Sequence, residues 1–351
     1  DARRRMHRRA EERLDDLRRL RARLAVLPGE PRDRHARRGR VRLDERAHLR
    51  EHLELLGVLN SSTACFWLKQ VSHNKGSTVD NKGARQTQVP WEDFYEYTGT
   101  KLQQFPLPNS LPLDRGRILD ALAQETAVTT PSAVVSAWLE NPTGSLSDVL
   151  AIAENGWHRI RDRMVFEQEE LDWEVYGLYG LIDADLTYSG VAIDAIMLGQ
   201  RAFEIALARR AEEGTEETAW FERHNSTPIT ELPDSWPNDY KALIQHRLEL
   251  MNSDRAIRLL EKPEFKRRWA TTDWATQRKE ALQQAVLDRL EDPTPWQDVQ
   301  GPTTRSVAEL ADLLRADPVL KELARALKQM CEDNDRHVKL VCEDSGAAGT
   351  P

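Results

Sequence analysis

The order of hydrophobic and polar positions predicts a chain built mainly from helices. Between residues 146 and 181 apolar side chains recur at helical spacing, which predicts one long helix of about 54 Å, bent or broken at Gly156 or Gly177. Further helices are expected over 240–260, with a joint at Asn252-Ser253, and over 274–290 and 320–330.

Four predicted helices begin with a recognisable chemical signal. A Ser followed three residues later by an acid forms a capping box, and a Pro in the first helical position suits a helix start. The capping boxes are Ser145 with Asp148 and Ser306 with Glu309, and the prolines follow Thr130 and Asp317.

The N-terminal third has a different pattern, which predicts a small α+β segment. An apolar helical stretch over 53–68 is interrupted by the small polar residues 60–62, and a polar connector follows over 72–88. Prolines between Leu102 and Leu113 favour a strand or strand edge there over a helix. The predicted fold is therefore mainly α-helical, with a small α+β target-recognition segment near the N-terminal third.

Residues 1–50 form a separate Arg-rich segment, holding 18 Arg and 9 acidic residues without Lys or aromatic side chains. Spacing of leucines from Leu14 to Leu27 predicts a helix ended by Pro28-Gly29, followed by a disordered stretch. One interpretation is a basic arm for nucleic acid, and the other is a solvated helix with a tail, or residues not native to the fold. The composition break near Leu43 and the first residue, Asp1, lead to the hypothesis of a truncated or mis-started product.

The remaining composition narrows the function classes. No apolar run reaches the roughly 18 residues of a membrane-spanning helix, no signal peptide is evident, and the three cysteines form no metal-binding pair. We therefore expect a cytoplasmic protein without membrane contact. After residue 50 the charge balance is −17, from 32 basic and 49 acidic residues. Any contact with DNA must then come from a local patch.

Two clusters of potential metal ligands are weighed against structural roles. His48-Leu49-Arg50-Glu51-His52 matches the H-x-x-E-H arrangement of inverted zinc peptidases, but no third ligand is evident downstream. The acids of 167–174 lack the paired Glu-x-x-His motifs of a di-iron bundle, so they are interpreted as a solvated helix face. The neighbouring aromatics are expected in the core. They are Trp157, Trp173, Tyr176 and Tyr179.

Several strings carry a family resemblance over about residues 53–269. They are "LLGVLNSSTACFW", "KLQQFPLP", "LPLDRGRILDALAQE", "EELDWEVYGLYGL" and "TAWFERHNSTPITELP". Together they resemble the C-terminal part of the PglX family, adenine-specific DNA methyltransferases of type 2 BREX phage-defence systems. The resemblance implies methyl transfer from S-adenosylmethionine to adenine N6 after the base is flipped out of the duplex. The chain lacks an Asn-Pro-Pro-Tyr motif and a glycine-rich cofactor loop. We therefore assign no catalytic, cofactor or metal residue and expect a fragment inactive alone.

What the resemblance leaves is DNA recognition. Lysines and arginines in the connector would neutralise phosphates, while Asn and Gln amides suit bidentate pairing with adenine. A basic cluster beside Trp269 is a second candidate, although helix C-terminal charges complementing the dipole explain it somewhat better. The candidate DNA-binding residues are Asn74, Lys75, Lys82, Arg85, Gln86, Gln88, Lys266 and Arg267.

The expected partners are double-stranded DNA and either other defence-system proteins or a separate methyltransferase half. A competing function is a helical protein-interaction module that docks onto defence proteins without touching DNA. The negative net charge after residue 50 supports this alternative. The predicted segments are 1–50, the end of a target-recognition domain over 51–125, and a helical C-terminal domain over 126–351.

Overall fold

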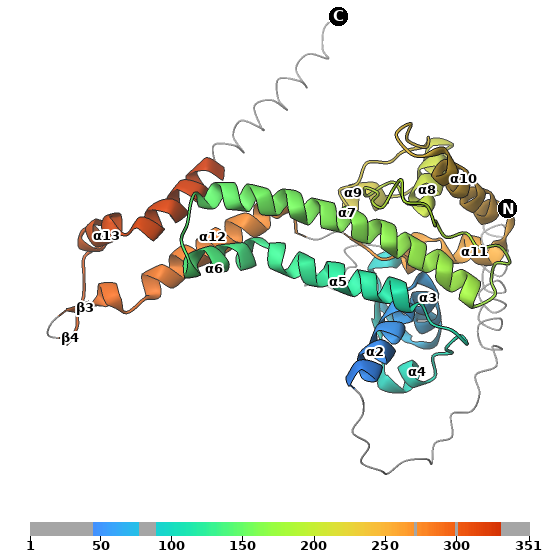
Figure 1. Ribbon diagram of the computed structural model, residues 1–351, viewed down its shortest axis with the longest axis horizontal. Helices are drawn as coiled ribbons and strands as arrows, with labels where there is room; N and C mark the ends of the chain where they lie inside the picture. Colours follow the sequence, from blue (N-terminus) through green and yellow to red (C-terminus); the bar gives the residue numbers. More distant parts are fainter. Residues whose placement is uncertain (1–44, 77–88, 270–271, 299–300, 331–351) are drawn as a thin grey trace, which may run out of the picture. The chain divides into compact units, whose positions relative to one another are not determined.

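The computed structural model describes residues 45–76, 89–269, 272–298 and 301–330 (Figure 1). The described residues are mainly helical, with a small α+β part in the N-terminal third, so the predicted fold class is confirmed. The chain forms two compact units that interleave along the sequence. The first unit holds residues 1–123 and 162–270, and the second holds 124–161 and 271–351. The functional segments divided at residues 50 and 125 stay a prediction.

The first unit combines helices with one short hairpin. Its elements are α2 (Glu45–Leu59), α3 (Ser62–Val71), β1 (His73–Gly76), η1 (Pro90–Glu92), β2 (Phe94–Glu96), α4 (Gly99–Gln103), α8 (Ala202–Glu212), α9 (Trp220–Arg223), α10 (Asn238–Ser253), α11 (Arg255–Leu260) and η2 (Pro263–Phe265). The helices α5 (Leu113–Thr129) and α7 (Leu146–Leu178) each contribute one part to this unit and one to the other.

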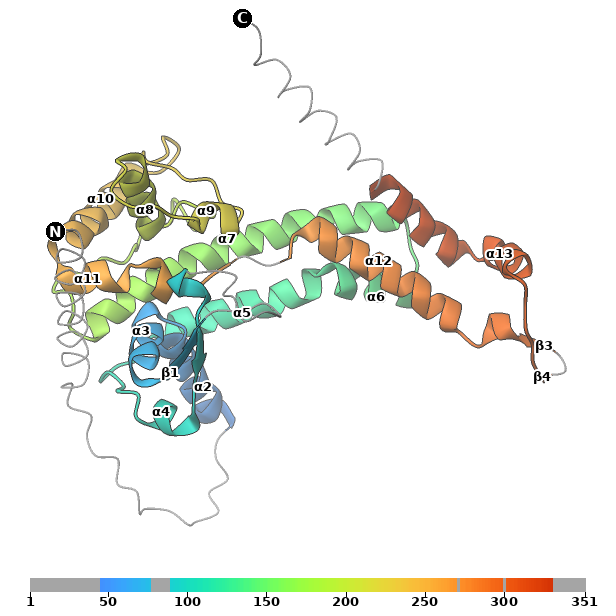
Figure 2. The ribbon, with the colours of Figure 1, turned by 180° about the vertical axis from the view of Figure 1, so that it is seen from behind.

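The predicted interruption of the first apolar stretch is confirmed as the break between α2 and α3. Ser61 has extended backbone there, and its side chain accepts a hydrogen bond from the Ala64 N–H, as a helix N-cap does. Strand β1 then pairs antiparallel with β2, with Asn74 opposite Tyr95 and a bulge before Gly76. The hairpin lies beside α3 (Figure 2), because the Lys69 ammonium sits 5.1 Å from the ring centre of Tyr95.

The expected strand over 102–113 is wrong. The chain instead forms the short helix α4, whose N-cap Thr98 accepts from the Lys101 N–H, and then runs without helix or strand to α5. The prolines do keep residues 105–112 out of a helix, as their fixed φ and missing N–H require. No neighbouring strand pairs with this segment in the described sheets, so extended backbone does not become a strand.

A close crossing of α2 and α5 depends on glycine. A Cβ on Gly116 would overlap the Leu53 carbonyl oxygen, and one on Gly57 would lie 2.8 Å from the Pro112 carbonyl oxygen. Gly116→Ala is expected to lower the free energy of unfolding by about 1–3 kcal/mol, since the helices must separate. Urea unfolding measures this. The control is Gly177→Ala, where nothing lies within 4 Å of the new methyl group. Equal stability of both variants would disprove the tight crossing.

The long helix α7 confirms the predicted helix to within three residues at its end, and it passes both Gly156 and Gly177 without a break. It ends at Leu178, and Gly180 two residues later has a φ of 61°. There the Leu181 N–H donates to the Tyr176 carbonyl at 2.9 Å and the Gly180 N–H donates to the Gly177 carbonyl at 2.8 Å. These two bonds form a Schellman motif, in which glycine provides the left-handed residue.

The second unit packs helices around one apolar core. Helix α6 (Pro131–Glu140) lies along α12 (Trp274–Glu291) (Figure 1), together with the first part of α7 and a helix over 318–330. The core consists of Val135, Trp138, Leu146, Leu150, Leu282, Ala285, Leu320, Leu323 and Ala326. The unit also contains η3 (Thr294–Trp296), the short pair β3 (Gln297–Asp298) and β4 (Gly301–Pro302), and α13 (Val307–Ala316).

The predicted helix starts are confirmed by side-chain caps. Ser306 and Glu309 form both halves of a capping box, and Ser145 accepts from the Asp148 N–H at 3.3 Å. Thr130 accepts from the Ala133 N–H, and Asp317 accepts from the N–H groups of residues 319 and 320. None of the described helices is both long and apolar enough to cross a bilayer.

Candidate nucleic-acid interface

The acidic face of α7 is buried, so its interpretation as a solvated face is wrong. Glu167, Glu169, Glu170 and Asp172 are each at most 3% exposed. Cationic side chains from distant parts of the sequence pair with these acids. The spacing of acidic residues along one helix cannot predict such partners. Arg115 pairs with Glu167 and lies 3.8 Å from a Glu174 oxygen. The aromatics Trp157, Trp173, Tyr176 and Tyr179 are buried, as predicted.

Arg247 of α10 is the most enclosed of these cations, with no exposed surface. Its Nη2 donates to both carboxylate oxygens of Glu170 at 2.8 Å, and its Nε donates to the Leu186 carbonyl at 3.0 Å. The guanidinium also lies 5.1 Å from the ring centre of Trp173. A buried charge of this kind is tolerated only when its partners are present. Arg247 therefore fixes α10 to α7 and to the loop after α7.

Lys266 joins a second buried ionic group. Its Nζ donates to Glu261 at 2.5 Å and to Asp172 at 3.0 Å, and its side chain is 1% exposed. The Tyr176 hydroxyl donates to the same Glu261 oxygen at 2.6 Å. Lys266 was predicted to bind DNA, but this geometry directs its ammonium inward and leaves no charged surface for a phosphate. That assignment is corrected to a structural role.

The pKa values in this group follow from two carboxylates sharing one ammonium. Burial, together with the negative charges of Glu169 and Asp172, raises the pKa of Glu261 to about 7 against the lowering effect of the Lys266 charge. Its second oxygen, Oε2, has no hydrogen-bond partner among the described residues. The pKa of Lys266 is raised, because the Asp172 and Glu261 charges outweigh its burial.

Asp172 also holds the start of α3, which carries the hairpin. Its two carboxylate oxygens accept from the Ser62 N–H at 2.7 Å and from the Ser62 hydroxyl at 2.6 Å. A carboxylate at this position complements the positive end of the helix dipole. At the other end of α3, the Lys69 ammonium donates to the Glu264 carbonyl at 2.5 Å. The buried ionic groups thus position α3, η2 and the hairpin against α7.

The hairpin presents the two described candidates of the polar connector at the surface. The Asn74 amide nitrogen donates to Asp93 at 2.9 Å, and its oxygen accepts from the Gly76 N–H at 2.6 Å. The Lys75 ammonium lies 3.2 Å from Glu96, in a pair in which both side chains are about half exposed. Such exposed pairs contribute little, so Lys75 can exchange Glu96 for a phosphate. Lys82, Arg85, Gln86 and Gln88 lie outside the described residues.

Exposed aromatic rings accompany these polar groups, and the sequence analysis did not select them. Phe94 is 59% exposed and Tyr97 is 54% exposed. Tyr97 stacks on Tyr95, with ring centres 6.1 Å apart and planes inclined by 15°. Arg268 acts on the same region: partial burial raises the pKa of Tyr97 to about 12, and the Arg268 charge opposes that rise. The concentration of aromatic residues in Phe94-Tyr95-Glu96-Tyr97 was the available signal. We call Asn74, Lys75, Phe94, Tyr95, Tyr97 and Arg268 the hairpin surface. Asn74, Tyr95 and Tyr97 lie on one face of the hairpin, and Lys75 and Phe94 lie on the other.

Arg267 is exposed but held in place, unlike its buried neighbour Lys266. Its Nη1 donates to the Asn60 side chain at 3.2 Å, and its guanidinium lies 4.6 Å from the ring centre of Trp269. A guanidinium ordered by an aromatic ring loses less freedom when it binds a phosphate. Of the two candidates in the basic cluster, Arg267 therefore keeps the geometry of a phosphate contact.

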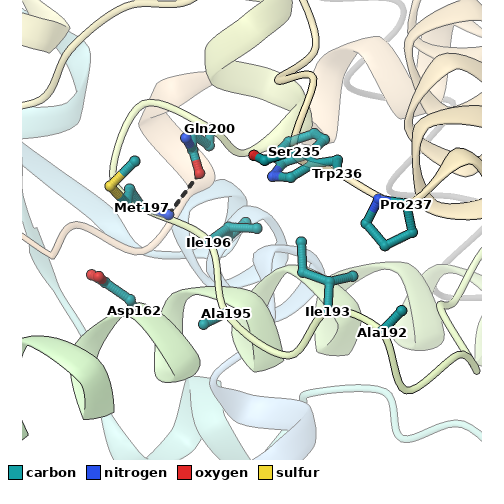
Figure 3. Close-up of a pocket in the computed structure, with 10 residues that line it drawn as sticks. All are labelled: Asp162, Ala192, Ile193, Ala195, Ile196, Met197, Gln200, Ser235, Trp236 and Pro237. Atoms are coloured by element: carbon teal, nitrogen blue, oxygen red, sulfur yellow. Dashed lines mark hydrogen bonds between the residues drawn. The ribbon is translucent and has the colours of Figure 1, made fainter.

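One open pocket of about 300 Å³ lies between α7 and the loops at 192–200 and 235–237 (Figure 3). Seven of its ten lining residues are apolar, and the Gln200 side-chain oxygen accepts from the Met197 N–H at 2.9 Å. No lysine or arginine lines it to hold the carboxylate of S-adenosylmethionine, and no glycine-rich loop does so. The pocket does not fit that cofactor. Among the described residues no three potential ligands meet to hold a metal ion.

Comparison with known proteins gives the family. The model of a domain of unknown function, DUF7008, matches residues 164–345, just over half of the chain. The chain belongs to the DUF7008 family. The DUF7008 region contains the acidic face of α7 together with Arg247, Glu261 and Lys266, whereas the hairpin precedes it. No solved structure matches the chain.

A curated relative extends the similarity beyond the DUF7008 region. Adenine-specific methyltransferase PglX of Streptomyces coelicolor is 45% identical over 317 residues, covering 86% of this chain and 26% of the relative. The chain thus spans about a quarter of that relative's length. Only about 49 residues of the chain fall outside the match, so the hairpin surface is inside it wherever the match begins. The predicted resemblance to PglX methyltransferases is confirmed.

Proposed function

We propose that this chain is the DNA-contacting C-terminal portion of an adenine-specific DNA methyltransferase. The similarity to PglX supports the reaction class, and the hairpin surface supports the contact with DNA. The observation that carries the proposal is an exposed hairpin that presents Lys75 and aromatic rings and is held in place by buried ion pairs on the face of α7.

The methylation step requires groups beyond those described above. S-adenosylmethionine would supply the methyl group and an Asn-Pro-Pro-Tyr type motif would hold the adenine amine; we infer that both belong to the rest of the methyltransferase. The role of this chain is then to bind and position double-stranded DNA in the cytoplasm. Membership of a BREX phage-defence system, with other defence proteins as partners, is part of the same proposal.

Electrostatics restrict how the chain binds DNA. With a balance of −17 after residue 50, the overall field repels a duplex, so attraction depends on the exposed Lys75, Arg267 and Arg268. A small number of phosphate contacts gives weak binding that falls as salt concentration rises. We therefore expect measurable affinity at low salt only.

The test is DNA affinity of the purified chain as a function of salt concentration. Lys75→Ala and Arg267→Ala are each expected to reduce the slope of log affinity against log salt by about one, as for the loss of one phosphate contact. Fluorescence anisotropy with a labelled duplex measures it. Arg325→Ala, an exposed position in the second unit, is the matched control and should leave the slope unchanged.

Lys82→Ala and Arg85→Ala extend the same measurement to the rest of the predicted connector. A chain that binds no duplex at low salt would contradict the proposal. It would favour instead a module that binds defence proteins. That function is supported by the acidic charge balance and by exposed apolar residues such as Ile152 and Val307.

A further inference from the structure

We propose that the hairpin surface binds unpaired bases by stacking them on Phe94 and Tyr97. This inference rests on the proposed contact with DNA and names the part of the nucleic acid that the surface recognises. It differs from the predicted reading of base edges by amides, because it requires bases whose faces are accessible.

The two rings are suited to stacking by their exposure and chemistry. Phe94 has no polar atom, so it cannot form a hydrogen bond with a base edge or a phosphate. Its aromatic ring is available for stacking, because the Phe94 side chain is 59% exposed on the three-residue strand β2. Every base has a face that can stack on such a ring, and stacking tolerates any sequence.

Tyr97 is supported from behind as a stacking platform. The ring of Tyr95 lies nearly parallel beneath it, and Tyr95 is itself held by the Lys69 ammonium on one side. Lys69 is in turn fixed to the Glu264 carbonyl. A base that stacks on Tyr97 would therefore extend an ordered column and would not have to order a loose side chain. This arrangement reduces the entropy lost on binding.

A cationic side chain acts near each ring, and the same hairpin also carries Glu92, Asp93 and Glu96, of which Glu96 pairs with Lys75. Lys75 lies on the strand paired with that of Phe94, and the charge of Arg268 acts on Tyr97. Aromatic faces with cationic side chains at their edges are the combination that single-stranded nucleic acids require. An apolar protein partner would gain nothing from these charges, so the combination favours a nucleic acid over a protein.

Unpaired bases arise wherever a base is taken out of a duplex for chemistry, a step that costs a few kcal/mol in lost stacking and pairing. A surface that stacks on the bases freed in this way would recover part of that free energy. The hairpin surface would then favour duplexes that are locally open over fully paired ones.

The test compares the affinity of the 351-residue chain for three oligonucleotides of one sequence. They are a fully paired duplex, the same duplex with a central unpaired adenine tract, and the single strand. We expect tighter binding to the opened duplex than to the paired one. Phe94→Leu and Tyr97→Leu should each reduce the preference for the opened duplex over the paired duplex by about tenfold. Quenching of 2-aminopurine in the unpaired tract reports stacking directly.

Two control variants separate stacking from charge and from misfolding. Phe94→Trp keeps an aromatic face and should retain the preference, whereas Lys75→Ala should weaken binding to all three oligonucleotides. If the chain binds DNA with no preference for unpaired bases, or if Phe94→Leu retains it, the stacking proposal is overturned. If no oligonucleotide binds at low salt, the proposed contact with DNA fails with it. Circular dichroism of each variant confirms that the fold is intact.

Discussion

Replacement of Arg247 by methionine is expected to lower the free energy of unfolding of the first unit by about 3–5 kcal/mol. The substitution fills a similar volume but removes the partner of Glu170, whose two oxygens each accept from Arg247 at 2.8 Å. Glu169 also loses a cation 3.6 Å away. Two buried carboxylates would then lack their common counter-charge, a larger penalty than the loss of the ion pair's own attraction.

Urea unfolding, followed by tryptophan fluorescence, measures this loss. Trp173 reports on the site because it lies against the Arg247 guanidinium. The matched control is Arg50→Met in the same unit, where the arginine pairs with Glu54 but is 67% exposed. That change should stay within about 0.5 kcal/mol of the parent. Similar losses for both arginines would show that the Glu170 pair is not a condition of the fold.

The sequence predicts the helices well because their signals are local. The capping box of Ser306 and Glu309 and the apolar spacing of α7 each depend on neighbours a few residues away. The segment at 102–113 was wrong for the same reason: proline forbids helix locally, but a strand needs a partner that the local pattern cannot supply.

The ionic groups on α7 could not be predicted from local sequence patterns. Asp172 meets Lys266 across 94 residues and Glu170 meets Arg247 across 77, so nothing in the helix sequence distinguishes these acids from a solvated face. The burial of Lys266 could not be predicted for the same reason, because its partner Asp172 is distant in the sequence. Lys266 is therefore buried and not a DNA contact, while the neighbouring Arg267 is exposed. The sequence alone could identify the polar connector as part of the candidate site. The orientation of Phe94 and Tyr97 could be assigned only from the strand register of the hairpin in the structure.

The raised pKa of Glu261 makes the stability of the first unit depend on pH. A carboxyl group whose pKa rises from 4.5 to about 7 on folding binds more protons in the folded than in the unfolded state between those values. Its contribution to stability is therefore fully present below about pH 4.5 and is lost as pH rises through about 7. The expected loss across this window is about 3 kcal/mol.

Glu261→Gln tests this directly, because glutamine keeps the shape and remains neutral at every pH. The variant and the parent should be similarly stable near pH 4.5, and the variant should gain on the parent as pH rises, by about 3 kcal/mol near pH 7. Subtracting the two urea-unfolding profiles removes the contribution of other titrating groups such as His224, whose pKa is lowered by burial. Glu216→Gln, at a partly exposed pair with Arg210, is the control and should show no such divergence.

Parallel profiles for Glu261→Gln and the parent would mean that Glu261 is already ionised at pH 4.5. Lys266 would then satisfy both carboxylates at once, and the buried group that holds α3 would keep its strength across the whole pH range.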